Sequence, residues 1–479
     1  MAKVKELTKM ASAILITEIR STGRETRSPR CFWRISLEDM KRSNDNSTFL
    51  QTQKYTKLLA SVVLLSFLLS CGGLFRAKVF IPAPVLSEET IVIEELPQAF
   101  KVSTETPPPL KSNISAPQLG IDRLHLFKDS LIGKRIAVVA NQTSVVNEVH
   151  LVDTLLALKL NVVKVFAPEH GFRGDADAGQ HIGHSTDDKT GLPLVSLYGS
   201  DKKPSQHQLE DIDIVIYDIQ DVGVRFYTYI STLHYVMEAC AEYNKQLVVL
   251  DRPNPNGHYI DGPVLEAPFK SFVGMHPVPI VYGMTIGEYA MMINGEGWLS
   301  NSKRCQLWVI PCKNYKHKIP YSLPVSPSPN LRTNAAIALY PSLCLFEATT
   351  VSVGRGTDKP FEIYGHPKFP KGNYQFMPIP TIGAKNPLHM NKLCQGIELN
   401  LSTAKRPYQI NLHYLINAKE LLGDSITFID QPSFFNRLAG TATLKEQLDK
   451  GWSAKEIRAT WKPGLDAFIQ TRSKYLLYE

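Results

Sequence analysis

Residues 163–174 read Val-Lys-Val-Phe-Ala-Pro-Glu-His-Gly-Phe-Arg-Gly and join an apolar, β-branched run to a dense polar cluster. An acid, a base and a cation follow the run at once, held between glycines: Glu169, His170 and Arg173. A buried strand that stops at such a group is typical of a functional site, because ligands in open sheets bind beyond the strand ends. The alternative is an ordinary polar turn after a strand.

Strand and helix signals alternate on both sides of this segment. Apolar runs of strand length occupy residues 135–140, 161–167, 212–217 and 246–251. Helical patterns occupy residues 151–159 and 228–244. Near-continuous apolar strands separated by helices predict an α/β fold with a parallel sheet that is covered on both faces.

Polar residues follow four of these strands. The clusters are Asn141 with Thr143, Glu169 with His170 and Arg173, Asp218 with Gln220 and Asp221, and Asp251 with Arg252 and Asn254. The carboxyl ends of parallel strands meet at one edge of a sheet, so the four clusters predict a single cleft. Glu169 is the best candidate for a chemical role, because a carboxyl flanked by apolar side chains can stay protonated and act as a general acid. A structural ion pair with Arg173 is the alternative.

Two later segments add candidate binding residues. Arg225 offers a fork for a carboxylate, and Tyr227 and Tyr229 offer flat faces with hydroxyl tips, although the aromatic rings also suit a helix core. The Gly-rich turn 353–357 is expected to aim Arg355 into the cleft, since it lacks the ending of a phosphate-binding loop. Two further polar residues stand in otherwise rigid or apolar stretches: Asn330 and Glu347.

No cofactor or metal is expected from these patterns. The segment that holds His170, Asp175, Asp177, His181 and His184 matches no common ligand spacing. The five cysteines of the body form no CxxC pair, and most stand in apolar surroundings, so buried thiols are expected. The net charge of +8 is partly a property of the leader and gives no reason to expect nucleic acid.

The first 71 residues are interpreted as a leader. Residues 58–70 are apolar, follow two lysines and are too few to span a membrane, which takes roughly 20 residues. Leu-Leu-Ser-Cys71 resembles a bacterial lipobox, which predicts export and a membrane anchor through a lipid on Cys71; an ordinary signal peptide is the alternative. Residues 1–39 do not suit such a signal, so the true start is expected further along. The Pro-rich residues 72–118 are interpreted as a linker.

The body of the chain is predicted to hold two domains, because it is longer than one core usually supports. The alternating strands and helices form the first domain, 119–317. Residues 318–479 are less regular, with a strand-to-loop segment at 351–358 and amphipathic helices at 453–478. A smaller mixed α+β domain is expected there.

Several long motifs together resemble a family of exo-β-N-acetylmuramidases, glycoside hydrolases long carried as a domain of unknown function. They are PEHGFRG (168–174), DADAG (175–179), YDIQDVGVRFYTYIST (217–232), DRPNPNG (251–257), FVGMHPVPIVYGMTIGEYA (272–290), SPSPN (326–330) and VGRGT (353–357). The resemblance implies release of N-acetylmuramic acid from the non-reducing end of peptidoglycan fragments. It also implies a Rossmann-like first domain, a smaller second domain, and an active site in the cleft between them.

This reading gives the candidate residues specific roles. Glu169 becomes the general acid, with Asp221, Asp218 or Glu347 as the second carboxylate. The residues expected to bind substrate are Asn141, His170, Arg173, Asp177, Gln220, Arg225, Tyr227, Asn254, Asn330 and Arg355. A muramyl substrate carries a lactyl carboxylate, for which Arg225, Arg173 and Arg355 are the candidate cations. Retaining, inverting and acetamido-assisted mechanisms all remain open at this point.

Two other functions compete with the muramidase. One is a surface lipoprotein that binds cell-wall fragments without cleaving them. The other is a hydrolase that acts on an amide or ester of the same ligand. Ser231 and Ser328 lack the context of a nucleophile elbow, which disfavours a serine hydrolase.

Overall fold

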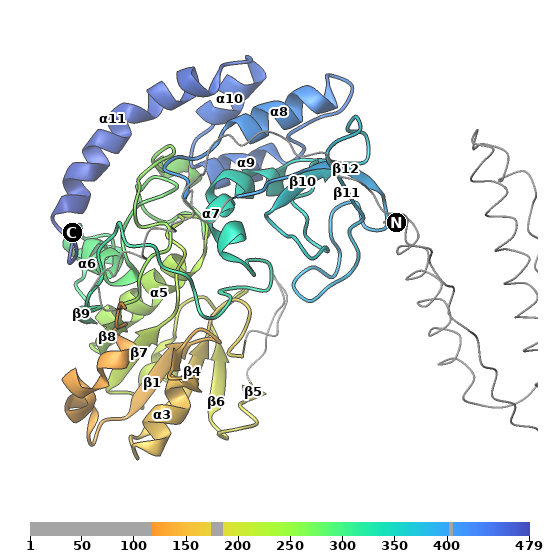
Figure 1. Ribbon diagram of the computed structural model, residues 1–479. Helices are drawn as coiled ribbons and strands as arrows, with labels where there is room; N and C mark the ends of the chain where they lie inside the picture. The colour runs from red at the N-terminus through yellow and green to blue at the C-terminus, as the bar shows by residue number, and fades with distance from the viewer. Residues whose placement is uncertain (1–115, 174–184, 402–405) are drawn as a thin grey trace, which may run out of the picture. The chain divides into compact units, whose positions relative to one another are not determined.

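The computed structural model describes residues 116–173, 185–401 and 406–479, which belong to a compact unit that begins at Pro108 (Figure 1). The predicted leader, the lipidation site Cys71 and most of the predicted linker lie outside the described residues, and so does Asp177. The predictions for those positions therefore stay predictions.

A seven-stranded sheet forms the centre of the first part of the unit, in the order β5-β6-β4-β1-β7-β8-β9. Its strands are β1 (Ile136–Ala140), β4 (Val162–Ala167), β5 (Ser185–Thr186), β6 (Pro193–Ser196), β7 (Ile214–Asp218), β8 (Gln246–Leu250) and β9 (Gln306–Ile310). All neighbouring pairs are parallel except β5 with β6. The predicted parallel α/β sheet is thus confirmed, and the four predicted strands match β1, β4, β7 and β8 to within two residues at either end.

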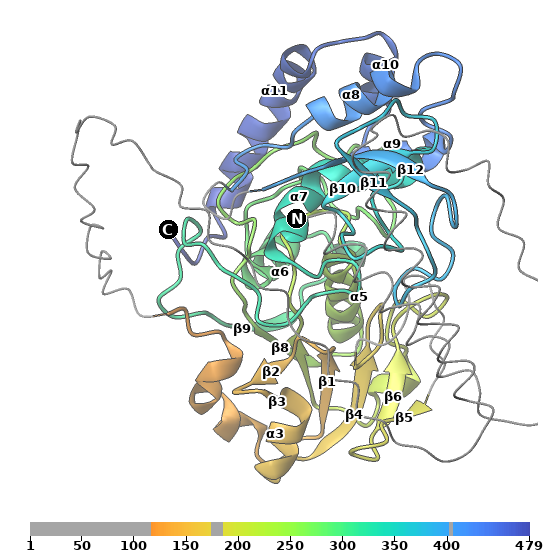
Figure 2. The ribbon, with the colours of Figure 1, turned by 45° about the vertical axis from the view of Figure 1, so that its right-hand side comes forward.

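Both faces of this sheet are buried, because alternate strand residues enter two separate cores. Ala137 and Val139 of β1 belong to one core, and Ile136 and Val138 belong to the other. The first core includes two helices, α5 (Tyr229–Glu242) and α6 (Ile286–Gly295), and it continues into apolar residues of the second part of the unit. On the opposite face lie α3 (Leu151–Ala157) and the 3-10 helices η2 (Ile121–Leu126) and η3 (Lys128–Leu131), as Figure 2 shows for α3 and α5.

The order of the strands reverses beside β1. The chain first builds outward through β4 to β6, then returns to the other side of β1 with β7 and continues to β8 and β9. This order is that of Rossmann-like folds, in which the reversal opens a crevice at the carboxyl ends of the strands. The edge that carries the four polar clusters therefore borders the crevice.

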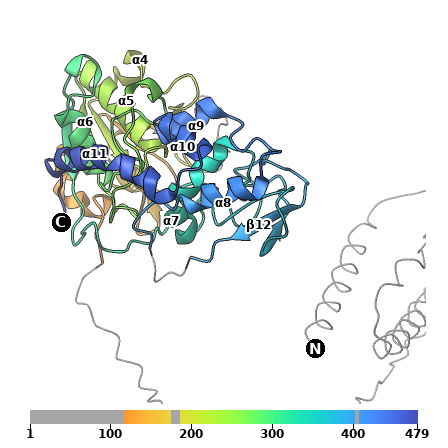
Figure 3. The same cartoon turned by 90° about the horizontal axis from the view of Figure 1, so that it is seen from above.

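The second part of the unit is mixed α+β, as expected. Its antiparallel sheet has the order β10-β12-β11 and consists of β10 (Ile363–His366), β11 (Tyr374–Phe376) and β12 (Cys394–Glu398). Its helices are α7 (Asn334–Leu343), η6 (Cys344–Ala348), α8 (His413–Leu422), α9 (Pro432–Ala439), α10 (Thr443–Asp449) and α11 (Ala454–Ser473), seen from above in Figure 3. The strand predicted at 351–358 was wrong: those residues form loops, with one isolated bridge between Ser352 and Gly365.

Hydrogen bonds join the C-terminal end of the chain to the first part of the unit. The guanidinium of Arg472, near the end of α11, donates to the carbonyl of Gly283 at 2.9 Å. The Tyr478 hydroxyl donates to Asp251 Oδ2 at 2.5 Å, directly after β8. The predicted division at 317/318 stays a prediction.

Short elements connect the larger ones. They are β2 (Val145–Val146), β3 (Val149–His150), α4 (Gln206–Leu209), η4 (Ala267–Phe269) and η5 (Ser300–Ser302). Within the described ranges, no helix is both long and apolar enough to cross a membrane. The five cysteines of these ranges are buried free thiols, as their apolar surroundings predict.

Candidate active site

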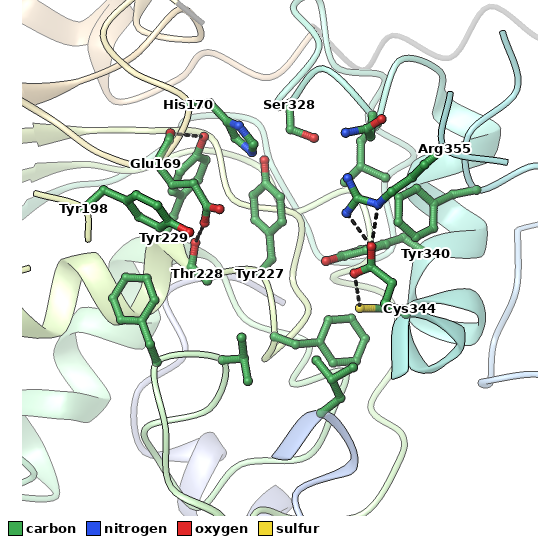
Figure 4. Close-up of a pocket in the computed structure, with 18 of the residues that line it drawn as sticks. Glu169, His170, Tyr198, Tyr227, Thr228, Tyr229, Ser328, Tyr340, Cys344 and Arg355 are labelled. Carbon is green, nitrogen blue, oxygen red and sulfur yellow. Dashed lines mark hydrogen bonds and ion pairs between the residues drawn. The ribbon is translucent and has the colours of Figure 1, made fainter. Parts of the chain in front are cut away.

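A cavity of about 360 Å³ lies at the junction of the two parts (Figure 4). The first part contributes the loops after β4 and β6 and the segment that leads into α5. The second part contributes α7, η6 and the turn around Arg355. The polar residues of the lining are Glu169, His170, Tyr198, Tyr227, Thr228, Tyr229, Ser328, Asn330, Tyr340, Cys344, Glu347 and Arg355.

Glu169 reaches the cavity because the chain turns sharply after β4. His170 and Gly171 both have positive φ, 70° and 80°, and the Gly171 N–H donates to the Pro168 carbonyl at 3.0 Å. Thr228 Oγ1 donates to Glu169 Oε2 at 2.7 Å. Burial, together with the Glu169 charge and a hydrogen bond to it, raises the pKa of Tyr198, which therefore stays protonated beside the carboxylate.

A second carboxylate, Glu347, lines the cavity from η6. Arg355 donates to its Oε1 through both Nε and Nη2, each at 2.5 Å. Cys344 Sγ lies 3.6 Å from its Oε2, and burial and the Glu347 charge raise the pKa of the Cys344 thiol well above its ordinary value. The thiol is thus a donor to the carboxylate. In Figure 4, Arg355 and Cys344 lie across the cavity from Glu169.

The turn that carries Arg355 depends on its two flanking glycines. Gly354 has a φ of 78° and Gly356 one of 82°. A Cβ on Gly356 would come within 2.6 Å of the Ile379 carbonyl oxygen and of Pro387. The predicted turn that aims Arg355 into the cleft is therefore what the structure contains, and other side chains at these two positions would strain it.

Aromatic and apolar side chains form much of the remaining lining. Tyr227 lines the cavity, and its hydroxyl donates to the Pro327 carbonyl at 2.8 Å. Its ring meets that of Tyr229 edge-on, with the centroids 4.8 Å apart. The apolar members are Phe226, Phe272, Val273, Leu331, Phe361, Phe434 and Leu438. Such a wall suits the methyl groups and ring faces of an acylated sugar.

Arg225 does not reach the cavity, which corrects the expectation that it binds a substrate carboxylate. Its side chain is fully buried, and Nη1 and Nη2 donate to four backbone carbonyls. The acceptors are those of Pro263, Val278, Leu438 and Ala439, at 2.7 to 3.0 Å. Arg225 thus joins the first part of the unit to the end of α9, and a substrate carboxylate has no access to it.

Asp221 and Asp218 are also absent from the cavity lining, which leaves Glu169 and Glu347 of the four candidate carboxylates. Asp221 is buried, and its Oδ2 accepts from the Gly223 N–H at 2.6 Å and from the Tyr282 hydroxyl. Gln220 and Asn254 are likewise buried in backbone contacts. Gln220 Nε2 donates to Pro253 O at 2.9 Å, and Asn254 Nδ2 donates to Met284 O at 2.8 Å. These three side chains hold the loops beyond the strands.

Asn141 and Arg173 have structural partners beside the cavity. Asn141 Nδ2 donates to the Tyr229 hydroxyl at 2.9 Å, while its Oδ1 accepts from Thr143. Arg173 pairs with Asp187, with Nη2 2.9 Å from Oδ2, and its guanidinium lies over the Phe172 ring. The alternative for Glu169, an ion pair with Arg173, is not what forms, since the partner of Arg173 is Asp187. His170, Asn330 and Arg355 line the cavity as expected, and Asp177 lies outside the described residues.

Five polar residues of the cavity lining were not proposed as site residues by the motif analysis: Tyr198, Thr228, Ser328, Tyr340 and Cys344. Thr228 stands inside a motif that drew attention only to its neighbours. Tyr198 follows β6, a short strand with half-exposed residues that gave no strong signal. The parallel pairing of β4 with β6 places Tyr198 at the same edge of the sheet as Glu169, and this pairing was the one signal that could have identified Tyr198. The described residues contain no group of three or more His, Cys, Asp or Glu side chains placed to hold a metal.

Comparison with known proteins decides the family. Residues 136–335 match the model of the N-terminal domain of the exo-β-N-acetylmuramidase NamZ, and residues 338–478 match that of its C-terminal domain. The chain belongs to the exo-β-N-acetylmuramidase family. Both halves of the family pattern meet at the cavity, because the first supplies Glu169 and the second supplies Glu347 and Arg355.

Individual relatives agree with this family. The chain is 39% identical to the peptidoglycan β-N-acetylmuramidase NamZ of Bacillus subtilis over 385 residues, which are 75% of this chain and 91% of the relative. Two crystal structures of DUF1343 family proteins from Bacteroides fragilis are also similar. One is 48% identical with a TM-score of 0.70, and the other is 30% identical with a TM-score of 0.66. In both cases the similarity covers 76% of this chain and 99% of the chain in the crystal structure.

Proposed function

We propose that this protein is an exo-acting glycoside hydrolase that releases N-acetylmuramic acid from the non-reducing end of peptidoglycan fragments. The observation that carries the proposal is the placement of two carboxylates, Glu169 and Glu347, in one cavity of a chain from this family. The cavity volume, about 360 Å³, lies near the lower end of the range for small-ligand sites, roughly 300–1,000 Å³. That size suits one terminal sugar.

Glu169 is the proposed general acid. Glycosidases need a carboxyl group that protonates the leaving glycosidic oxygen, and a second carboxylate or a substrate group that acts at the anomeric carbon. Glu169 lies at the cavity wall and is held there by Thr228 and Tyr198. A group fixed in this way keeps its orientation toward a bound glycosidic oxygen without further ordering.

Glu347 is the proposed second carboxylate. Its contacts with Arg355 and Cys344 fix its position in the cavity. An anionic carboxylate stabilises the positive charge that develops on the sugar ring in the transition state, whether it acts directly or by orienting the 2-acetamido group. Asp221 is not available for this role, because it lies outside the cavity lining.

Arg355 is the proposed partner of the lactyl carboxylate that distinguishes muramic acid from glucosamine. Of the three candidate arginines, Arg225 is enclosed by carbonyls and Arg173 is paired with Asp187. Arg355 lines the cavity and uses Nε and Nη2 on Glu347, while its Nη1 makes no hydrogen bond with a described residue. A guanidinium can bind two carboxylates through different edges, so Nη1 is suited to the substrate.

The direct test is hydrolysis of a chromogenic β-N-acetylmuraminide. Glu169→Gln is expected to lower kcat/KM about a hundredfold or more while the fold is kept, because a general acid supplies about 10²–10⁴ in rate. Glu210→Gln, on the exposed surface after α4, is the matched control and should leave the rate unchanged. Wild-type turnover in Glu169→Gln would remove Glu169 from the chemistry.

The same assay separates the competing functions. A binding protein without catalysis would retain measurable affinity for a muramyl disaccharide and leave it intact after long incubation. An amidase or esterase would release a product whose mass differs from that of free N-acetylmuramic acid. Either result in the wild-type protein would overturn the glycosidase proposal.

Export and lipid anchoring form a separate part of the proposal. They rest on the apolar residues 58–70 and on the Leu-Leu-Ser-Cys71 sequence. Growth with a labelled fatty acid should label the wild-type protein and leave Cys71→Ala unlabelled. Equal labelling of the two proteins, or of neither, would contradict a lipid on Cys71.

A further inference from the structure

The loop that joins β11 to β12 concentrates the exposed apolar surface of the protein. Among the described residues, fourteen large apolar side chains are exposed, and six of them lie within residues 377–393. They are Met377, Ile379, Ile382, Leu388, Met390 and Leu393, with Ile382 72% exposed. Single exposed apolar residues are ordinary, but a cluster of this density marks a surface that contacts something apolar.

The backbone of this loop is fixed, so the exposure is built into the fold. The Asn391 N–H donates to the Pro378 carbonyl at 2.8 Å and closes the loop at its base. The Ile379 N–H donates to Gly356 O at 2.9 Å, and His389 Nε2 lies 2.7 Å from Thr350 O. The apolar side chains at the two ends of the loop are thereby brought together on a preformed support.

The segment that contains the loop is rich in lysine. Between Glu362 and Glu398 the chain contains four lysines, Lys368, Lys371, Lys385 and Lys392, and no acidic residue. All four lysines are exposed. Figure 1 shows this region at the side of the C-terminal part, around β11 and β12. The surface is therefore apolar and carries more lysines than carboxylates, with the exposed Asp430 near His389 as the acidic neighbour.

We infer that the 377–393 loop and its flanking lysines dock on an anionic lipid surface. Apolar side chains enter the boundary between headgroups and acyl chains, while lysines remain at the level of the phosphates. Two other occupants fit less well. A second copy in a symmetric dimer would place the same lysines against each other. A saccharide platform needs flat aromatic faces, and residues 377–393 contain no Phe, Tyr or Trp.

The inference goes beyond the proposed hydrolase and does not depend on it. The loop lies next to the cavity, since Asn330 Nδ2 donates to Gly383 O at 2.8 Å, but the exposed side chains are not among the cavity lining. Nor does it depend on the lipid at Cys71, because the contact is made by the folded body itself.

Cosedimentation with lipid vesicles tests the inference. The protein used is residues 108–479, because the solved relatives are covered to 99% by three quarters of this chain and so fold without the preceding segment. It is expected to bind vesicles of equimolar phosphatidylcholine and phosphatidylglycerol, and to bind pure phosphatidylcholine much more weakly. Absence of binding to the mixed vesicles would overturn the inference.

Two double variants separate the apolar and the charged contributions. Ile382→Ser with Leu393→Ser should weaken binding to the mixed vesicles about tenfold or more, because both side chains lose their transfer from water. Lys371→Ala with Lys392→Ala should weaken it by about tenfold or more, since each lysine near an anionic surface contributes about fivefold. Ile132→Ser with Lys134→Ala, an exposed pair before β1, is the control and should bind as the wild type does.

Three other outcomes would contradict docking on a lipid surface. Loss of binding in the lysine variant with full binding in the apolar variant would indicate simple attraction to polyanions and contradict membrane docking. Equal loss in the control would show that the loop has no special role. A dimer in sedimentation analysis that the apolar variant dissociates would assign the surface to a second copy instead. The thermal unfolding midpoint, followed by circular dichroism, serves as the folding check for every variant and does not depend on the proposed activity.

Discussion

Thr228 donates a hydrogen bond of 2.7 Å to Glu169 and so ties the segment before α5 to the loop after β4. The two residues are 59 positions apart in sequence, but β4 and β7 lie on either side of β1 and end at the same edge of the sheet. The orientation of the proposed acid therefore depends on a side chain from a different strand connection.

The first prediction concerns this bond. Thr228→Val keeps the shape of the side chain and removes the donor, so Glu169 loses its fixed orientation. We expect kcat/KM for a chromogenic muraminide to fall about tenfold to a hundredfold, since small misplacements of a reacting group have effects of that size. Thr228→Ser restores the hydroxyl and should recover most of the rate. Equal activity of the valine and serine variants would show that the bond is unimportant for catalysis.

Arg355 should determine the preference for muramic acid over glucosamine. Arg355→Lys keeps a charge near Glu347 but loses the second edge of the guanidinium. The expected result is a rise in KM for the muraminide of about tenfold, as for one charge-assisted hydrogen bond, and little change for the matching N-acetylglucosaminide. Parallel kinetics on the two chromogenic substrates measure the ratio. Equal losses on both would assign Arg355 to Glu347 alone.

Arg225 should be required for stability. Arg225→Met leaves four buried carbonyls without their donor, and each orphaned polar group costs about 1–3 kcal/mol before relaxation. We expect the free energy of unfolding in urea to fall by about 3–5 kcal/mol, at the upper end for single substitutions.

Gly440 provides an independent check of the Arg225 site. Its φ is 78°, and a Cβ there would come within 2.5 Å of Arg225 Nη2. Gly440→Ala should therefore destabilise the protein through the same contact, by about 1–3 kcal/mol. If Arg225→Met were as stable as the wild type and had lost only substrate affinity, the structural role of Arg225 would be contradicted and a role in substrate binding would be supported.

Asp221 should affect stability rather than turnover. Burial raises the pKa of its carboxyl to about 6, although Tyr282 and backbone N–H groups oppose the shift. The unfolded value is about 3.9, so the folded state binds the proton more tightly. The stability gained from this proton is complete below about pH 4 and is lost as the pH rises through about 6.

Asp221→Asn separates the two roles of this position. An amide does not ionise, so the wild type should lose about 3 kcal/mol relative to the variant between pH 4 and pH 7, measured by urea unfolding. Turnover of the variant at neutral pH should stay within a few-fold of the wild type. A loss of two orders of magnitude with an intact fold would return Asp221 to the catalytic pair.

The central strands could be predicted from the sequence because a strand buried on both faces is marked by a continuous run of apolar residues. Residues 136–140 and 162–167 are apolar at nearly every position, which suits only strands buried on both faces. The short β6 and the half-exposed β9 escaped prediction, because their residues lack that continuous pattern. The prediction that the four polar clusters share one edge required only that the strands be parallel, because the carboxyl ends of parallel strands lie at the same edge.

The candidate site was only partly predictable for a different reason. Glu169, His170, Tyr227, Asn330, Glu347 and Arg355 were named from the sequence and line the cavity. Gln220, Asp221, Arg225 and Asn254 carry the same residue types at the same edge, but they satisfy buried backbone groups instead. Polar residues at a crowded strand edge serve either purpose, since every buried carbonyl and N–H needs a partner.

The sequence by itself determined a parallel α/β sheet, the edge at which ligands bind, and the strand end that carries Glu169. The tertiary structure alone decided that Glu347 and Arg355, from the second part of the chain, face that strand end, and that Arg225 turns away from it. The physical reason is that strand formation depends on the period of apolar residues along one segment. The direction of a polar side chain depends on which carbonyls and carboxylates distant segments bring within reach.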